Sequence, residues 1–113
     1  GPMLMDSPSY DAPSVTGIVA GGAQVVVFTT GLGTPFGMSI VPVIKVMSNT
    51  PAFTRMEDTA DFNAGTILDG DESIAQAGRR LFDLVLQVAN GRTTKAEMLG
   101  ENQCQIWRTT LTL

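Results

Sequence analysis

The sequence predicts an open α/β fold, Rossmann-like and three-layered, in which helices flank a small and mostly parallel sheet. Two runs rich in β-branched residues, 24–30 (QVVVFTT) and 40–48 (IVPVIKVMS), are typical of strands buried on both faces of such a sheet. A long segment with helical spacing, 74–89, follows them. Because strands and helices alternate along 113 residues, we expect one compact α/β domain.

The N-terminal half begins with Gly-Pro, which is typical of a scar left by tag cleavage, so we expect the domain to span residues 3–113. The apolar residues 3–5 predict a short strand, and a polar loop follows. Residues 14–22 predict a helix that Ser14 caps and that its two final glycines end. Pro42 is expected near the start of the second strand, because proline cannot donate to a central ladder.

The C-terminal half is predicted to be mostly helical. A short helix starts with Thr50 as its N-cap and Pro51 at the first helical position, and residues 61–71 form a turn-rich connection. The predicted helix 74–89 ends at Asn90-Gly91. It buries one apolar stripe, which includes Ala77, Leu81, Phe82, Val85 and Val88.

The last segments carry one cap and one strand. Thr94 and Glu97 have the spacing of a capping box, and 104–113 (CQIWRTTLTL) predicts a final strand. Cys104 is expected to be a buried strand thiol rather than a nucleophile, and Trp107 to be a core residue.

Composition excludes several classes of function. The net charge is −4 and the seven basic residues are scattered, which argues against a nucleic-acid partner. No apolar run approaches the ~18 residues of a membrane-spanning helix. The chain has no histidine and one cysteine, so it holds no Ser-His-Asp triad, no His-bearing metal site and no internal disulfide. These features predict a cytoplasmic protein without a membrane anchor.

The clearest candidate site is the stretch TTGLGTPFG, residues 29–37, directly after the first strand. In open α/β sheets, ligands bind beyond the carboxyl ends of the strands. Glycines let backbone amides approach an anion, and threonine hydroxyls add donors. The alternative is a turn that serves geometry alone. The candidate substrate-binding residues here are Thr29, Thr30, Gly31, Gly33 and Thr34.

Two further candidates follow from the second strand. Lys45 interrupts an apolar run, so it either reaches toward a substrate carboxylate or snorkels from an edge strand. Asn49 either contacts substrate or caps the next helix. Asp61, Asn63 and Gly65 are expected to order a turn, with contact to a substrate or metal across a domain boundary as the alternative.

Four separated stretches, in order along the chain, resemble the C-terminal part of the altronate dehydratase and galactarate dehydratase family. They read VTGIVAGGAQVVVFTTGLGTPFG, IKVMSNT, RMEDTADFNAGTILDG and ANGRTTKAEMLG. The resemblance implies a hydro-lyase that removes water from an aldonate or aldarate, with this chain as one domain of a longer enzyme that would be inactive alone. It also implies a divalent metal, iron or manganese, bound mainly outside this chain. A relative within the family cleaves sulfite from sulfolactate.

One position departs from the family pattern. The family loop commonly has arginine between the two glycines, whereas this chain has Leu32. A guanidinium could pair with a carboxylate in bidentate fashion and leucine cannot. The departure implies that the arginine is dispensable, that the substrate differs, or that activity is lost. The expected partners are a sugar acid and the remaining domains of the enzyme. A non-catalytic role in assembly, with a homodimer as its product, is the alternative function.

Overall fold

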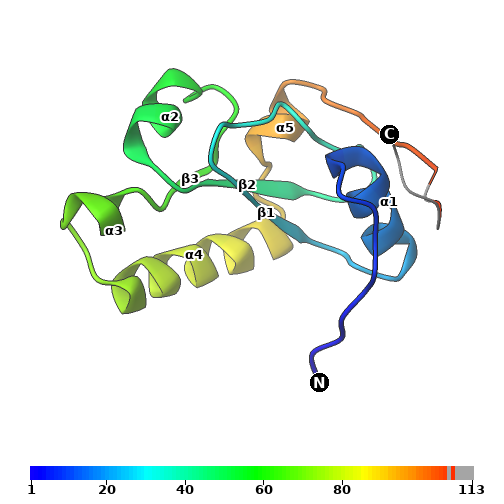
Figure 1. Cartoon of the computed structure of the whole chain (residues 1–113), viewed down its shortest axis with the longest axis horizontal. Coiled ribbons are helices and arrows are strands. Elements are labelled where there is room, and N and C mark those ends of the chain that lie inside the picture. The colour runs from blue at the N-terminus through cyan, green and yellow to red at the C-terminus, as the bar shows by residue number, and fades with distance from the viewer. Residues whose placement is uncertain (107, 109–113) are drawn as a thin grey trace.

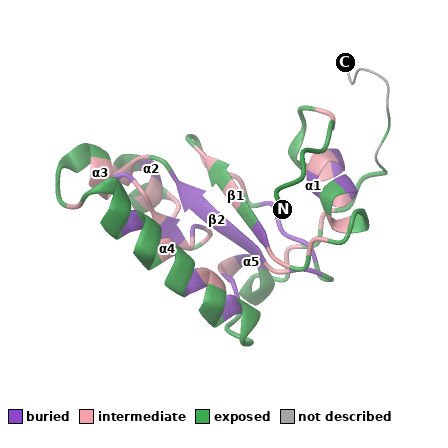
Figure 2. Ribbon diagram, turned by 90° about the horizontal axis from the view of Figure 1, so that it is seen from below, coloured by how far each residue is buried: buried purple, intermediate pink, exposed green. Residues whose placement is uncertain are grey.

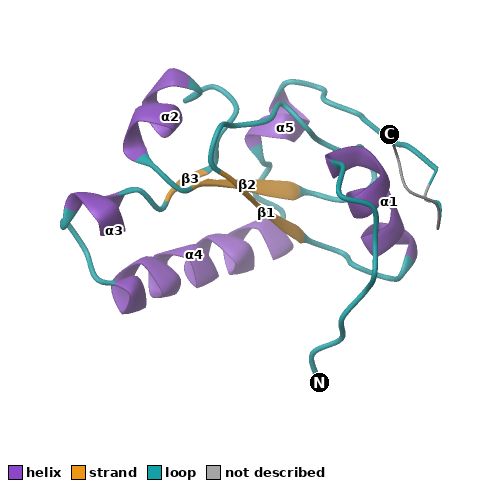
Figure 3. Cartoon of the chain, in the orientation of Figure 1, coloured by secondary structure: helices purple, strands orange, loops and turns teal. Residues whose placement is uncertain are grey.

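Within the part of the chain that the structure describes, the domain has three parallel strands and five helices (Figures 1 and 3). The computed structural model describes residues 1–106 and 108. Along the chain the elements are α1 (Asp11–Ala20), β1 (Val26–Thr30), β2 (Val43–Met47), α2 (Thr50–Arg55), β3 (Phe62–Asn63), α3 (Thr66–Asp69), α4 (Ile74–Ala89) and α5 (Lys95–Met98).

The sheet has the strand order β1-β2-β3, and both pairings are parallel. Val26 lies opposite Val43 at one end of the first pair, and Val46 lies opposite Phe62 in the second. All five residues of β2 are buried, as its continuous apolar run predicts. Pro42 directly precedes β2, as expected. The predicted class, an open parallel α/β sheet with flanking helices, is confirmed.

In the sheet that the described residues form, β1 is an edge strand, and the prediction that it is buried on both faces is wrong. Val26 is its one buried residue, while Val27 is 43% exposed and Thr29 is also exposed. A run of valines indicates that a strand forms, but it does not indicate which position the strand takes in the sheet. The central position belongs to β2 because a third strand pairs with its other edge.

β3 and α3 both lie inside the segment expected to be a connection. β3 has only two residues, too few for a periodic pattern to show in the sequence. It forms because Asp61 and Ala64 donate backbone hydrogen bonds to the Lys45 and Met47 carbonyls, at 3.0 and 2.8 Å. Long-range pairing decides this strand, not local propensity.

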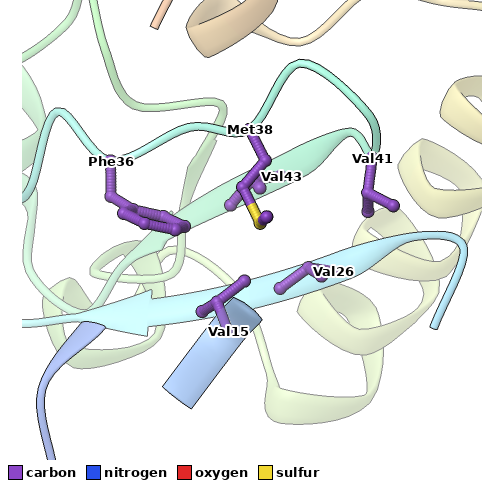
Figure 4. Close-up of a cluster of buried hydrophobic side chains, with 6 residues drawn as sticks. All are labelled: Val15, Val26, Phe36, Met38, Val41 and Val43. Atoms are coloured by element: carbon purple, nitrogen blue, oxygen red, sulfur yellow. The ribbon is translucent and has the colours of Figure 1, made fainter. Parts of the chain in front are cut away.

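Two apolar clusters cover the two faces of the sheet. On one face, α1 and the loop after β1 pack on the strands, with side chains pointing toward one another (Figure 4): Val15, Val26, Phe36, Met38, Val41 and Val43. On the other face, α4 packs through Leu84 and Val88 on Ile44, Val46 and Phe62. A third cluster, Met47, Ala52 and Ala60, anchors α2.

The helix ends follow the capping chemistry of the sequence with two corrections. The capping boxes of α4 (Ser73) and α5 (Thr94) both form. α1 starts earlier than predicted, with Tyr10 as N-cap, so Ser14 lies within the helix and caps nothing. The N-cap of α2 is Asn49, not Thr50, because the Asn49 side chain accepts a hydrogen bond from the Ala52 amide.

Several apolar residues outside these clusters are more exposed than predicted. Residues 3–5 form no strand and are exposed, and Phe82 is 57% exposed instead of belonging to the core. Residues 104–106 are not a strand, and Cys104 is exposed, with its sulfur 3.8 Å from the Thr16 hydroxyl. Trp107 and residues 109–113 lie outside the described residues. No helix in the described part of the chain has the length and apolar character needed to cross a membrane.

Candidate functional site

The candidate site is the edge of the sheet where the three parallel strands end. β1 ends at Thr30, β2 at Met47 and β3 at Asn63, and each is followed by a polar turn. Parallel strands bring these turns together in space although they are far apart in the sequence. The glycine loop 31–37 therefore meets the segment 48–50, which itself meets the turn 63–65, at this carboxyl edge.

The glycine loop folds back on its own strand. The Thr30 hydroxyl accepts a hydrogen bond from the Gly33 amide at 3.0 Å. Gly33 has a φ of +98°, a left-handed conformation that favours glycine, and a Cβ there would lie 1.9 Å from the Met56 sulfur. Further along, the Thr34 hydroxyl accepts from the Phe36 amide at 3.3 Å. The glycine at this position is therefore explained by geometry, which is the alternative that the sequence left open.

Asn49 joins the loop to the next strand. Its side-chain Nδ2 donates to the Gly31 carbonyl at 2.9 Å, and its Oδ1 accepts from the Ala52 amide at 2.9 Å. The Ser48 amide donates to the Thr30 carbonyl at 3.0 Å and extends the β1–β2 pairing by one step. Capping, one of the two roles predicted for Asn49, is thus observed, and the same side chain also holds the glycine loop in place.

The turn after β3 closes the edge on its other side. Asn63 Oδ1 accepts from the Gly65 amide at 2.8 Å, so the predicted ordering of this turn by Asn63 is confirmed. Asn63 Nδ2 donates to the Thr50 hydroxyl at 3.0 Å, and Thr50 also bonds Asp69. A Cβ on Gly65 would lie 2.1 Å from the Thr50 backbone nitrogen. The segment 48–50 therefore packs directly against both of the other turns.

Exposure at this edge differs from residue to residue. Thr29, Gly31 and Leu32 are exposed, with Leu32 at 84%, whereas Thr30, Gly33 and Thr34 are half-buried. The hydroxyls of Thr30 and Thr34 already accept backbone hydrogen bonds. Thr29, in β1 directly before the loop, is therefore the most accessible of the predicted threonines.

Lys45 is buried in the central strand, with 1% of its surface exposed, so it does not snorkel from an edge. Its Nζ donates to the Pro35 carbonyl at 3.3 Å and so reaches the glycine loop from the sheet. Burial lowers the pKa of Lys45, and the charges of Asp61 and Glu101 oppose that shift. An ammonium has three donors. The structure thus places this charge behind the loop and not on its exposed side.

Asp61 holds two elements together behind the edge. Its two carboxylate oxygens accept from the backbone amides of Lys45 and Lys95, both at 2.8 Å. These bonds fix the start of β3 against β2 and against the first turn of α5. Asp61 therefore orders the fold around Lys45 through bonds to distant segments, and not through bonds within its own turn as predicted.

An ion pair on the β3 side was not predicted. Arg80 pairs with Glu72, donates from Nη2 to the Asn63 carbonyl at 2.9 Å, and lies 4.1 Å from the centre of the Phe62 ring. Hydrogen bonds from Arg80 and Thr66 lower the pKa of Glu72. Arg79 and Asp83 have the i,i+4 spacing of a helical ion pair, which is not observed among the described residues. Among the described residues the observed ion pair is Arg80–Glu72, because the short strand β3 brings a carbonyl within reach of Arg80.

Sequence reasoning missed Ser48, Thr50 and Arg80 as neighbours of the glycine loop or of the turn after β3. The sequence signal that could have found them is a run of polar residues directly after a strand. After β1 this signal identified the whole loop, and after β2 it identified Asn49 but not its neighbours. The same signal has no starting point at β3, since that strand was not predicted.

A depression of about 640 Å³ lies elsewhere, between α4 and the start of β3. None of the predicted substrate-binding residues lines it; its wall includes Asp61, Phe62, Arg79, Arg80, Asp83 and Arg92. Within residues 1–106 and 108, no three His, Cys, Asp or Glu side chains gather as metal ligands would. The described residues of this domain therefore do not supply a complete metal site.

Comparison with known proteins identifies the family. Residues 1–112 match the family model described as "D-galactarate/Altronate dehydratase, C-terminal". The chain belongs to the D-galactarate/altronate dehydratase family. It is similar to galactarate dehydratase (L-threo-forming) of Escherichia coli K12, with 46% identity over 86 residues, which are 76% of this chain and 16% of that protein.

Two other relatives cover almost the whole chain. Altronate dehydratase of Bacillus subtilis is 33% identical over all 113 residues, which are 22% of its length. The beta subunit of (2R)-sulfolactate sulfo-lyase of Chromohalobacter salexigens is 35% identical over 108 residues, or 96% of this chain and 28% of that protein. The chain thus spans less than a third of each of these relatives and corresponds to the C-terminal domain of the dehydratase family.

Proposed function

We propose that this domain forms one wall of the substrate pocket of a hydro-lyase that removes water from a sugar acid of the altronate or galactarate type. The observation that carries the proposal is the meeting of the glycine loop with Asn49 at the carboxyl edge of the sheet. That edge is where open α/β sheets bind ligands, and the relatives named as dehydratases share the domain.

The chemistry assigns distinct tasks to this wall. Dehydration removes the proton next to the carboxylate and expels a β-hydroxyl, so an enediolate must be stabilised and a base and an acid must be positioned. This chain has no histidine, and its exposed groups at the edge are hydroxyls and backbone amides. It therefore binds and orients the polyol or carboxylate. The divalent ion expected for the reaction, iron or manganese, is held mainly by the rest of the polypeptide.

Within this wall the predicted residues take different roles. Thr29 and the exposed backbone at Gly31 face the ligand directly, while Thr30, Gly33 and Thr34 give the loop its shape. Asn49 and Lys45 hold the loop through the Gly31 and Pro35 carbonyls. Lys45 also contributes positive charge behind the loop, which favours an anionic ligand in front of it.

Thr29→Val in the full-length enzyme tests this assignment. Valine keeps the shape of threonine, and no hydrogen bond of the Thr29 side chain is found among the described residues, so the fold should stay intact. We expect kcat/KM to fall about tenfold, the effect of losing one hydrogen bond of roughly 1.4 kcal/mol. Steady-state kinetics with altronate and with galactarate measure it.

Thr93→Val is the matched control, because Thr93 is also exposed but lies beyond the C-terminal end of α4, away from the carboxyl edge. Its kinetics should equal those of the wild type. Equal kinetics for both variants would remove Thr29 from the pocket.

A second candidate is a lyase that releases sulfite from a sulfonated hydroxy acid. Two observations favour it: the similarity to the sulfolactate sulfo-lyase subunit, and Leu32 at the loop position where the family pattern has arginine. Sulfite release, assayed with sulfolactate beside the two sugar acids, separates the candidates.

A further inference from the structure

Arg80 is held from several sides although its side chain is 46% exposed. Its guanidinium pairs with Glu72 and donates from Nη2 to the Asn63 carbonyl at 2.9 Å. The same group lies 4.1 Å from the centre of the Phe62 ring, and its Nη2 is 3.4 Å from the Thr66 hydroxyl. An isolated surface ion pair contributes little stability, but a guanidinium with several partners has a fixed position. Arg80 therefore joins α4 firmly to the turn after β3.

The residue that Arg80 binds is itself held at both its backbone and its side chain. Asn63 is the last residue of β3, and its backbone carbonyl accepts from Arg80. Its Oδ1 accepts from the Gly65 amide at 2.8 Å, and its Nδ2 donates to the Thr50 hydroxyl at 3.0 Å. The turn after β3 is thus fixed from α4 on one side and bonded to α2 on the other.

The turn after β3 also touches the N-cap of α2 directly. A Cβ on Gly65 would lie 2.1 Å from the Thr50 backbone nitrogen and 2.6 Å from the Asn49 Cα atom. No space remains between the two backbones, so a displacement of the turn displaces Asn49 as well. Asn49 donates from Nδ2 to the Gly31 carbonyl at 2.9 Å. The position of Gly31 therefore depends on the position of the turn.

Arg80 lies outside the candidate pocket. It lines the depression between α4 and β3, and none of the predicted substrate-binding residues lines that depression. The contacts that lead from Arg80 to the glycine loop run through the turn after β3 and the N-cap of α2. Each of these contacts joins neighbouring residues at a stated distance, so the path is continuous.

We propose that Arg80 is a positioning residue for the glycine loop and acts from outside the pocket. It fixes the turn after β3, the turn fixes Asn49, and Asn49 fixes Gly31. Without the guanidinium, the Asn63 carbonyl loses this donor and the turn is freer to move, so the loop takes up more orientations. The inference rests on the proposed function in treating this loop as the wall that binds the sugar acid. A wall that must be ordered by its ligand binds that ligand less tightly.

Hydrogen exchange of the full-length enzyme, measured by mass spectrometry, tests the path without turnover. That enzyme also contains the preceding region of the polypeptide. Arg80→Met removes the guanidinium and keeps an unbranched side chain. We expect peptides that cover 31–37 and 48–52 to exchange about threefold to tenfold faster. Residues 43–46 of β2, which Figure 2 shows buried at the centre of the fold, report global unfolding and should keep the wild-type rate.

Arg79→Met is the matched control. Arg79 precedes Arg80 on α4 and lines the same depression, and it forms no ion pair within residues 1–106 and 108. Its loss removes the same charge from the same helix, so the exchange of 31–37 should stay at the wild-type rate. Equal exchange of 31–37 in the wild type and in Arg80→Met overturns the proposal. Equal acceleration in the two arginine variants overturns it as well.

Steady-state kinetics with altronate and galactarate measure the consequence for the pocket. We expect Arg80→Met to raise KM about threefold to tenfold and to leave kcat near the wild-type value, because a binding wall acts on ground state and transition state alike. A lower kcat at unchanged KM, with exchange accelerated throughout the domain, would show loss of folded enzyme and overturn the proposal.

A double variant tests whether Arg80 acts through Asn49. Asn49→Ser keeps an oxygen that can cap α2 and removes the Nδ2 donor to Gly31. If the path runs through Asn49, Arg80→Met adds nothing to the KM of Asn49→Ser. Effects of the two substitutions on KM that multiply would show independent action and overturn the proposal.

The two readouts separate this inference from the proposed function. Faster exchange of 31–37 in Arg80→Met with unchanged KM and kcat would support the positioning role and remove the loop from the pocket. Unchanged exchange in Arg80→Met, together with impaired kinetics of Thr29→Val, would overturn the positioning role and leave the pocket in place.

Discussion

Lys45 shows how far a single residue can be interpreted from sequence. A charge within an apolar run marked Lys45 as unusual. Its burial follows from the central position of β2, which pairs with a strand on each side. The sequence left open whether its strand was central or at an edge, because that depends on β3, a strand of two residues. Its bond to the Pro35 carbonyl joins an unusual core charge to the loop of the candidate site.

The shifted pKa of Lys45 predicts a dependence of stability on pH. Burial lowers the pKa below 10.5, so between the folded pKa and 10.5 the unfolded chain holds more protons than the folded one. The free energy of unfolding of the wild type, relative to Lys45→Met, should therefore be flat at neutral pH and rise through that window. The slope can reach about 1.4 kcal/mol per pH unit.

Urea denaturation of both proteins between pH 7 and 10.5 measures this difference. Methionine keeps the unbranched shape and removes the titrating group. Parallel stability curves would show that Lys45 is not desolvated in the folded state.

At the scale of elements, several features that local sequence signals decide were predicted correctly, and features that long-range contacts decide were not. The capping box at Thr94 and the stop at Asn90-Gly91 were predictable because the chemistry lies within a few residues. The edge position of β1, the strand β3 and the exposure of Phe82 were not. Each of these depends on which elements lie side by side, and no pattern within one element carries that information.

Two glycine substitutions test the packing of these elements in opposite directions. Gly65→Ala places a Cβ 2.1 Å from the Thr50 backbone nitrogen, so α2 and the turn after β3 must separate. We expect a loss of about 1–3 kcal/mol or more in the free energy of unfolding. Gly78→Ala, in the interior of α4 with no atom within 4 Å of its Cβ, should gain about 0.5–1 kcal/mol.

Chemical denaturation of the two variants of this chain beside the wild type is the measurement. If Gly65→Ala were as stable as the wild type, the close contact between the turns at the carboxyl edge would not exist in solution.

At the scale of the whole molecule, the fold class was predictable because two runs rich in β-branched residues and one long amphipathic helix suffice to indicate an open α/β sheet. The place of the site was predictable in outline, since the strand ends define the carboxyl edge. Its neighbours Thr50 and Asn63 required the third strand. The exposure of Phe82 could not be predicted, because a wide apolar stripe such as that of α4 is interpreted as core until the sheet beneath it is known to be narrow.

The central claim is that the carboxyl edge of this domain touches the substrate in the assembled enzyme. A crystal structure of the full-length dehydratase with a bound sugar acid tests it most directly. We predict a ligand oxygen within hydrogen-bonding distance of the Thr29 hydroxyl or of a backbone amide in residues 29–34. A ligand contacted only by the preceding region, with residues 29–34 remote from it, would contradict the account.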